Sequence, residues 1–343
     1  MLPSLLEPNQ SERFFRGGAR IARFRGVPPR GEHVPEDWVA STTVQFGERE
    51  AGLTRLPDGT LLRDAVEKDP VSFLGPAHVR ELGTDIALLV KLLDPGQRLP
   101  VHCHPSPEFA RHHLGSVHGK NEAWIVLGVD DSDDAVVHLG FKKELQGLDV
   151  AALVERQDSA TLLNALHRVP VHPGDTVFVP AGMPHAIGAG VFVLELQEPT
   201  DFSVMLEWEA FGLSGEGQLG LPLDTALGCL DRSRLPVADV LRLCADRPHE
   251  SGTDARIRHL FPVAADPYFR ARRIRPLGDQ VALPAAFSVL VVRAGKGELL
   301  TEYGGEKRPL PLHRGATVLV PYAAGPLTIR GDIDVFQCLP PGS

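Results

Sequence analysis

The chain has 343 residues with a formal net charge of -9, and 43% of its residues are hydrophobic. A net negative charge without a long basic segment argues against a nucleic-acid or anionic-membrane partner, because both require a positive protein surface. No segment reaches the roughly 18 to 20 apolar residues of a membrane span, and the acidic, proline-interrupted N-terminus is unlike a signal peptide. We therefore expect a folded cytoplasmic protein, large enough for two packed units.

Glycine and proline, at 34 and 30 residues, are dispersed through the chain and separate short apolar runs. This distribution is typical of all-β proteins with many turns. Apolar residues recur at helical spacing in three segments, at residues 60–75, 148–171 and 235–248. Pro70 should interrupt the first of these helices, and a proline in the first turn opens the third.

Strands are expected between the helical segments and again near the C-terminus. In the first block they fall at residues 86–94, 121–129, 135–141, 175–180 and 190–198. After residue 265 a second β-rich block repeats this rhythm, with runs at 287–295, 297–303, 316–322, 326–331 and 334–340. We predict a mainly β fold with segregated helices, in which the strands form two barrel-like or sandwich-like units.

A candidate metal site lies in the stretch LPVHCHPSPEF, at residues 99–109. Residues two apart on a strand share a face, so His102 and His104 would project their imidazoles to the same side, at a spacing suited to one metal ion. Such a pair is weak evidence alone, because a polar strand face explains it about as often. The context strengthens it, because residues 174–185 show the pattern G-x5-P-x-G-x2-H, which ends at His185.

This downstream pattern resembles the second motif of the cupin superfamily, whose first motif supplies a histidine pair and a later glutamate followed by a glycine. Glu122, in GKNEAWIVLG, is the candidate for that glutamate. It lies farther from the histidines than in ordinary cupins, so residues 106–120 are interpreted as an insertion. A cupin interrupted in this way resembles the type I mannose-6-phosphate isomerases, in their shorter bacterial form.

The resemblance to these isomerases covers most of the chain. Residues 162–201 follow the family closely in order and spacing, and residues 312–329 resemble its degenerate second cupin. The resemblance implies two jelly-roll barrels, of which the second is degenerate and metal-free. The implied division is a metal-binding cupin domain at 1–220 with a helical insertion at about 142–170, a helical connector at 221–264 and a degenerate cupin-like domain at 265–343.

The same resemblance implies the metal ligands. The zinc ligands of the family fall on His102, His104, Glu122 and His185. The family usually has glutamine where this chain has His102, so three histidines and a glutamate form the ligand set here, as in generic cupins. This set should hold Zn well, but it also suits Fe, Mn, Co or Ni.

Two residues are the catalytic candidates. Lys120 falls on an active-site lysine of the family, which indicates substrate contact or proton transfer, although a solvated loop lysine is the commoner alternative. Glu198 follows the last strand of the first block, close to Glu195 and Asp201. Acidic residues of the family occur in this place, and a solvated strand end is an equal explanation.

Two positions depart from the family. Pro100 stands where the family has a serine associated with the phosphate, and Met205 stands where it has an arginine that acts on the substrate. Neither side chain can donate a hydrogen bond to phosphate. Either other groups bind the phosphate, or the substrate carries none. The insertion, which we expect to rim the pocket, offers replacement donors that are individually more common as surface residues, namely Arg111, His112, His113 and His118.

Interconversion of an aldose and a ketose moves one proton between adjacent carbons, so the site needs a Lewis acid and a base. We expect a metal-dependent aldose-ketose isomerase that converts mannose 6-phosphate to fructose 6-phosphate or acts on another sugar or sugar phosphate, as a monomer or homodimer. Two alternatives stay open. One is a cupin dioxygenase that uses the same ligands with a redox metal, and the other is a non-catalytic sugar-binding relative.

Overall fold

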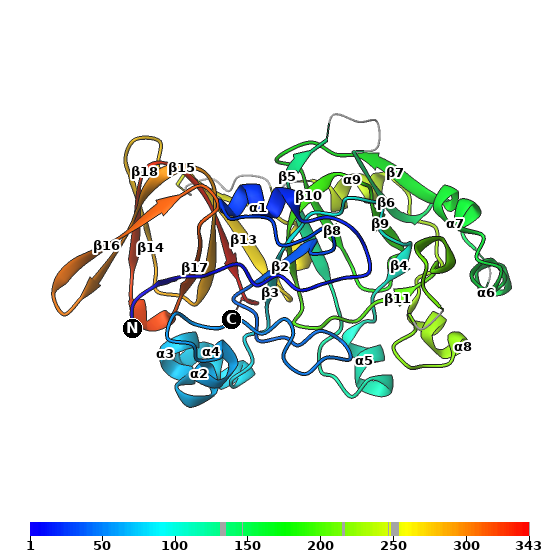
Figure 1. The fold of residues 1–343 in the computed structure, drawn as a ribbon, viewed down its shortest axis with the longest axis horizontal. Coiled ribbons are helices and arrows are strands. Elements are labelled where there is room, and N and C mark those ends of the chain that lie inside the picture. Colours follow the sequence, from blue (N-terminus) through cyan, green and yellow to red (C-terminus); the bar gives the residue numbers. More distant parts are fainter. Residues whose placement is uncertain (131–134, 146, 215–216, 246, 248–253, 343) are drawn as a thin grey trace.

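The computed structural model describes residues 1–130, 135–145, 147–214, 217–245, 247 and 254–342. Its strands form one sheet of eight strands and two sheets of five. Figure 1 shows two β-rich bodies side by side, with the eight-stranded sheet in one body and both five-stranded sheets in the other. Most helices lie at the periphery of these bodies. The prediction of a mainly β fold with segregated helices and two barrels is confirmed.

The first barrel is built from the two five-stranded sheets, whose orders are β2-β3-β10-β5-β8 and β11-β4-β9-β6-β7. The strands of the first sheet are β2 (Glu36–Val39), β3 (Leu89–Leu93), β5 (Glu122–Val129), β8 (Thr176–Val179) and β10 (Val191–Gln197). Those of the second are β4 (His102–Cys103), β6 (Val136–Phe141), β7 (Leu166–Pro170), β9 (His185–Ile187) and β11 (Val204–Met205). One apolar core lies between the sheets and includes Trp124, Val137 and Ile187.

Nine α-helices occur in the described part of the chain. They are α1 (Ala19–Arg25), α2 (Leu62–Lys68), α3 (Pro70–Leu74), α4 (Pro76–Leu82), α5 (Pro107–His113), α6 (Gly147–Glu155), α7 (Ser159–Ala165), α8 (Leu223–Ala226) and α9 (Val237–Leu243). The predicted interruption at Pro70 is confirmed: the proline stands in the first turn of α3, and the Asp69 carboxylate caps that helix by accepting from the Ser72 amide at 3.3 Å.

The helical segment expected at 148–171, and with it the helical insertion at about 142–170, needs a correction. Its last part, Leu166–Pro170, is strand β7, which pairs with β6 along its whole length. From His167 to Pro170, half-buried and exposed residues alternate. Hydrogen bonds to the neighbouring strand therefore outweigh the local helical spacing of the apolar residues.

The second barrel is the eight-stranded sheet. Six of its strands follow the order β1-β17-β15-β18-β13-β12, and in addition β14 pairs with β18 and β16 pairs with β15. Its strands are β1 (Ser4–Leu5), β12 (Ile257–His259), β13 (Arg270–Ile274), β14 (Gln280–Leu283), β15 (Ser288–Tyr303), β16 (Glu306–His313), β17 (Thr317–Val320) and β18 (Leu327–Leu339). Two pairs of expected runs each merge into one strand, β15 and β18. The first expected run ends at Gly295, which has a φ of 81°. A register shift just before this glycine lets β15 continue past it without ending.

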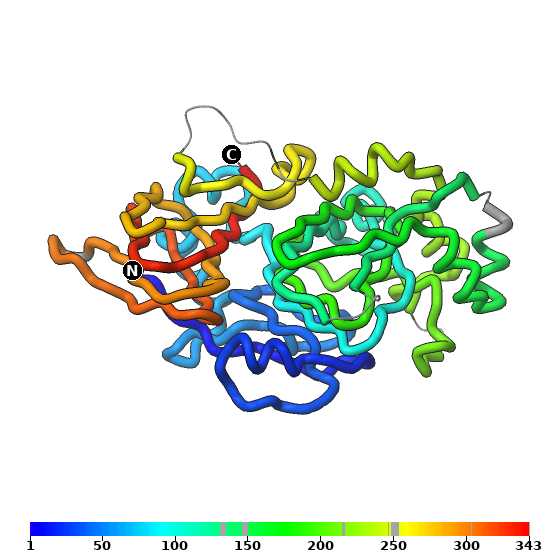
Figure 2. Tube along the Cα trace, turned by 90° about the horizontal axis from the view of Figure 1, so that it is seen from above, coloured from blue at the N-terminus to red at the C-terminus, as the bar shows by residue number. Residues whose placement is uncertain are grey.

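The N-terminal strand β1 belongs to this second barrel, because it pairs with β17. Figure 2 shows the N-terminal segment crossing from the second barrel to the first. The buried guanidinium of Arg25 fastens this crossing: it donates to the carbonyls of Leu6 at 2.6 Å and Gly315 at 3.1 Å, and its Nε lies 3.2 Å from the Asp37 carboxylate on β2. The predicted domain boundaries remain a prediction, and β1 and β12 join the second sheet from outside residues 265–343.

The two barrels share one apolar cluster, in which Phe178 and Phe192 of the first barrel pack with Phe269 and Phe336 of the second. The rings of Phe178 and Phe269 are 6.3 Å apart and nearly perpendicular. One face of the first five-stranded sheet is thus occupied by the second barrel, and the other face is left for the site. None of the helices in the described part of the chain has the length and hydropathy that crossing a bilayer requires.

Candidate metal centre and cavity

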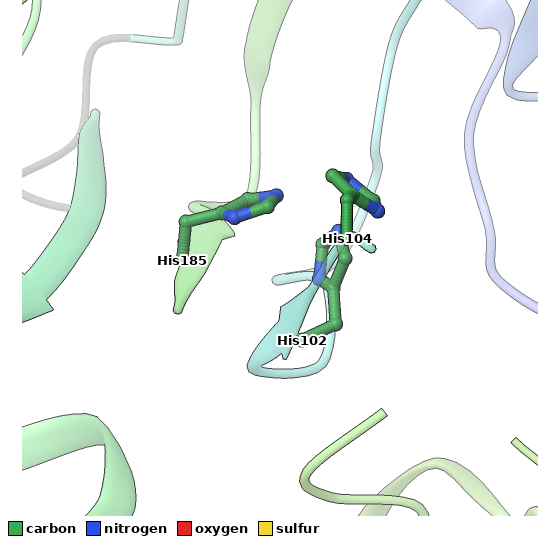
Figure 3. A group of neighbouring side chains, drawn as sticks. All are labelled: His102, His104 and His185. Carbon is green, nitrogen blue, oxygen red and sulfur yellow. The ribbon is translucent and has the colours of Figure 1, made fainter. Parts of the chain in front are cut away.

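Three histidines converge inside the first barrel. His102 on β4 and His185 on β9 pair directly across the two strands, and His104 follows His102 by two residues. The ligand nitrogens of the three residues lie within 4.8 Å of one another. Figure 3 shows the imidazoles extending from the two strands toward one space. The structure therefore brings together the three histidines that the sequence indicated as ligands.

Backbone carbonyls hold each of these rings in one orientation. Nδ1 of His102 lies 2.8 Å from the Pro100 carbonyl, Nδ1 of His104 lies 2.7 Å from the Phe202 carbonyl, and Nδ1 of His185 lies 2.8 Å from the Met183 carbonyl. A carbonyl oxygen can only accept, so each Nδ1 must be the donor. Each neutral ring then keeps its lone pair on Nε2, the tautomer that a metal-ligating histidine needs.

Glu122 and Lys120 complete this cluster. Glu122 begins β5, and its two carboxylate oxygens lie 3.1 Å from Nε2 of His104 and 3.2 Å from Nε2 of His185. The Lys120 ammonium lies 3.0 Å from Glu122 and donates to Nε2 of His104 at 3.1 Å. Burial alone would raise the pKa of Glu122, but Lys120 and His104 hold that pKa well below its usual value. The carboxylate therefore remains ionised.

The chemistry of these groups fits a metal ion. Nε2 of His185 is buried and has no hydrogen-bond partner among the described residues. Burial and the neighbouring histidines lower the pKa of His102 well below its usual value, and burial together with Lys120 lowers the pKa of His104 to about 3. Both rings are neutral at neutral pH and can each donate a lone pair. Three imidazoles and one carboxylate are a ligand set for first-row divalent ions.

A cavity of about 540 Å³ opens beside the cluster, and His102, Glu122 and His185 form part of its wall. This volume lies within the range of small-molecule sites. The lining is rich in charge. The acidic and basic residues of the whole lining are Glu12, Arg13, Glu36, Glu48, Lys91, Lys120, Glu122, Glu195 and Asp201.

The sequence did not point to Lys91 or Arg13 as cavity residues. Lys91 lies in the fully buried strand β3, its ammonium 3.8 Å from Glu195 and 4.5 Å from the centre of the Trp38 ring. Arg13 comes from the N-terminal segment and pairs with Asp201. The sequence did contain one sign of this arrangement, a single lysine within an apolar strand. A buried ammonium requires carboxylate partners, so such a lysine indicates acidic residues nearby.

The two glutamates near the end of β10 differ in position. Glu195, on β10, lines the cavity and is 3% exposed, and its Oε1 has no hydrogen-bond partner among the described residues. Burial and then the Glu122 carboxylate raise the pKa of Glu195 to about 7. Glu198 is also buried, but it accepts two hydrogen bonds from Asn121, each 2.8 Å long, and does not line the cavity. The geometry thus favours Glu195 over Glu198 as the group that reaches a substrate.

The four replacement donors expected from the insertion do not line this cavity. Arg111, His112 and His113 are exposed at the end of helix α5, where the ring of His112 bonds to the Glu108 carbonyl of its own helix at 2.8 Å. They form the last turn of the short helix α5, which lies at the periphery of the molecule (Figure 1). His118 lines a separate, smaller pocket.

His118 predicts a pH dependence of stability. Although burial opposes it, a hydrogen bond to Asp85 at 2.5 Å and the Glu198 carboxylate at 3.6 Å raise the pKa of His118 to about 9. The stabilisation is complete below the unfolded pKa of about 6.5 and is lost as pH rises through 9. Urea unfolding at pH 6 and pH 9.5 should show the wild type losing about 1 to 3 kcal/mol more than His118→Gln. The exposed His112→Gln variant is the control, and equal losses in all three proteins would contradict this assignment.

The two positions that depart from the family both lie in the cavity wall. Pro100 contributes its carbonyl to the orientation of His102. Met205, on β11, pairs with His102 on β4, so its side chain stands next to the metal centre. An apolar thioether therefore faces the substrate space where the family places a guanidinium.

No profile of a known protein family matches the chain. In sequence the chain is similar to the mannose-6-phosphate isomerase ManA of Bacillus subtilis, with 29% identity over 252 residues that span 73% of each protein. In structure it is similar to a mannose 6-phosphate isomerase from Bacillus subtilis, with a TM-score of 0.73 and 19% identity over 98% of this chain and 99% of that one. The apo form of mannose 6-phosphate isomerase from Salmonella typhimurium matches with a TM-score of 0.70 and 15% identity, over 99% of this chain and 100% of that one. The chain therefore resembles bacterial mannose-6-phosphate isomerases in sequence and shares the fold of their solved structures.

Proposed function

We propose that the chain is a metal-dependent aldose-ketose isomerase that acts on mannose 6-phosphate or a related sugar. One observation carries this proposal: three imidazoles and Glu122 meet beside a cavity whose lining also holds the buried carboxylate of Glu195. A metal centre and a base that share one substrate space are what proton transfer between adjacent carbons requires. A cytoplasmic location and a monomeric or dimeric state remain predictions from the sequence.

His102, His104, His185 and Glu122 are the proposed metal ligands, with zinc as the proposed resident ion and Fe, Mn, Co and Ni as alternatives of suitable chemistry. When bound, the ion would supply Lewis acidity to the carbonyl and hydroxyl oxygens of the sugar. The backbone carbonyls behind the three rings fix the direction of the ligand lone pairs, so these side chains need little rearrangement to bind an ion.

Glu195 is the proposed proton carrier. Because its pKa lies at about 7, the carboxylate and the carboxylic acid are both populated at neutral pH. The carboxylate would take the proton from C2 of the open-chain aldose, which leaves an enediolate. Return of the proton to C1, together with transfer of the hydroxyl proton from O2 to O1, gives the 2-ketose, and the carboxylate is restored.

Lys120 is a second proposed catalytic residue, and we assign it hydrogen bonding to substrate oxygens. Its ammonium lies 3.0 Å from Glu122 and 3.9 Å from Glu195, which places it between the metal centre and the proposed base. Apolar residues complete the cavity wall and limit the access of water to the enediolate. They include Phe15, Leu93, Leu99 and Ile187.

The test is NMR of the zinc-loaded protein in D2O with mannose 6-phosphate and, separately, with mannose. Deuterium entering C2 of the aldose, or formation of the ketose, is the expected result. A sugar that binds without exchange at C2 would contradict the isomerase proposal and favour the non-catalytic alternative. Oxygen consumption by the iron-loaded protein would favour the dioxygenase.

A further inference from the structure

We propose that the cavity selects an unphosphorylated sugar, so that the substrate is a neutral aldose. This inference rests on the proposed isomerase function, because it concerns the substrate of the same site. It is carried by the charges of the cavity wall and by the partners of each basic side chain in that wall.

Arg13 is held by two carboxylates. Its guanidinium contacts both oxygens of Asp201, at 3.2 and 3.4 Å, and its Nε lies 3.6 Å from Glu36. This bidentate pairing occupies the guanidinium N–H donors that would otherwise bind a phosphate. Burial alone would lower the pKa of Arg13, but Glu36 and Asp201 raise it, so the cation is matched within the wall.

The two lysines are surrounded in the same way. The ammonium of Lys91 lies between the carboxylates of Glu36, Glu195 and Asp201, at 3.8 to 3.9 Å from each. The ammonium of Lys120 faces Glu122 at 3.0 Å and Glu195 at 3.9 Å. No basic side chain in the described lining is therefore left without a carboxylate partner.

The total charge of the lining points the same way. The carboxylates are those of Glu12, Glu36, Glu48, Glu122, Glu195 and Asp201, and the basic side chains are those of Arg13, Lys91 and Lys120. Six carboxylates against three cations leave an excess of three negative charges when all are ionised, and a divalent ion would cancel two of them. A sugar phosphate brings about two further negative charges at pH 7. Placing that charge in a cavity that is already negative costs Coulomb energy.

A cation in the adjacent pocket is no better placed for a phosphate. His118 lines the adjacent pocket, but Asp85 at 2.5 Å and Glu198 at 3.6 Å already neutralise it. Neutral groups suited to hydroxyls and to the apolar face of a sugar ring are present in the cavity wall, including Gln45, Ser203 and the half-exposed ring of Phe46.

The experiment compares D-mannose with D-mannose 6-phosphate on the zinc-loaded full chain at equal ionic strength, measuring affinity by calorimetry and deuterium exchange at C2 by NMR. We expect mannose to bind and to exchange with a kcat/KM at least about tenfold above that of the phosphorylated sugar. A higher affinity or kcat/KM for mannose 6-phosphate would overturn the inference and leave the isomerase proposal standing. If neither sugar exchanges deuterium at C2, the isomerase proposal fails, and the two binding affinities decide the inference. Tighter binding of mannose than of mannose 6-phosphate supports selection of a neutral sugar. Tighter binding of mannose 6-phosphate, or no binding of either sugar, overturns it.

A matched pair of variants tests the cause. Met205→Arg adds a cation to the cavity wall next to His102. We expect it to shift the ratio of the two kcat/KM values toward mannose 6-phosphate by at least about tenfold, because each buried charge-assisted hydrogen bond contributes about that factor. Met205→Leu should leave the ratio unchanged. An unchanged ratio in a folded Met205→Arg variant counts against the electrostatic explanation, and if that variant does not fold, the wild-type ratio decides.

Discussion

Replacement of His104 by alanine is expected to reduce the bound metal from one ion per chain to almost none and to lower kcat/KM by about three orders of magnitude or more. His104 is 1% exposed and supplies one of the three lone pairs that meet at the centre. Its loss removes one ligand and leaves the ionised Glu122 and two imidazoles. These three remaining ligands bind a divalent ion weakly. Metal content by plasma mass spectrometry and isomerisation by NMR measure the two effects on the same sample.

His112→Ala is the matched control for this substitution. His112 belongs to the same stretch of chain, but it is exposed on α5 and does not line the cavity. It should keep the full metal content and activity. If His104→Ala retained one tightly bound ion per chain, the metal ligands would have been assigned to the wrong residues.

Replacement of Glu195 by glutamine is expected to lower kcat by about 10² to 10⁴ while the metal content stays at the wild-type level. The amide keeps the shape of the side chain but cannot take the proton from C2. Sugar affinity by calorimetry should change little, so the loss appears in kcat and not in binding. Exchange of deuterium at C2 should fall in parallel, because it reports the same proton transfer.

Glu198→Gln is the companion variant, because both acids are buried and lie three residues apart. Glu198 accepts from Asn121 and does not line the cavity, so this variant should keep activity within about fivefold. The opposite ranking, with Glu198→Gln inactive and Glu195→Gln active, would return the catalytic role to the residue that the sequence first suggested.

Much of the fold could be predicted from the sequence, because short apolar runs between glycines and prolines mark strands wherever both faces are buried. The main errors have one origin. The spacing in Leu166–Pro170 is compatible with a helix, and only the neighbouring strand β6 makes it β7. Likewise nothing in the first residues shows that β1 pairs with β17 of the other barrel. Partners distant in sequence decided these elements.

The metal centre could be predicted because its ligands sit in motifs with fixed spacing. The rest of the cavity could not. Arg13 reaches Asp201 across 188 positions of sequence, and no local pattern carries that information. The sequence favoured Glu198, and only the structure shows that Glu195 lines the cavity whereas Glu198 accepts hydrogen bonds from Asn121.

The pairing of β1 with β17 has a consequence for synthesis on the ribosome. Leu6 and Thr317, which the Arg25 guanidinium holds together, are 311 positions apart. At about 5 to 20 residues per second, the first strand waits roughly 15 to 60 seconds for its partner to emerge. The first barrel can assemble during that interval around the metal ligands, whereas the second cannot close until nearly the whole chain has left the tunnel. The barrel that holds the candidate metal ligands can therefore form before β1 and β17 are joined.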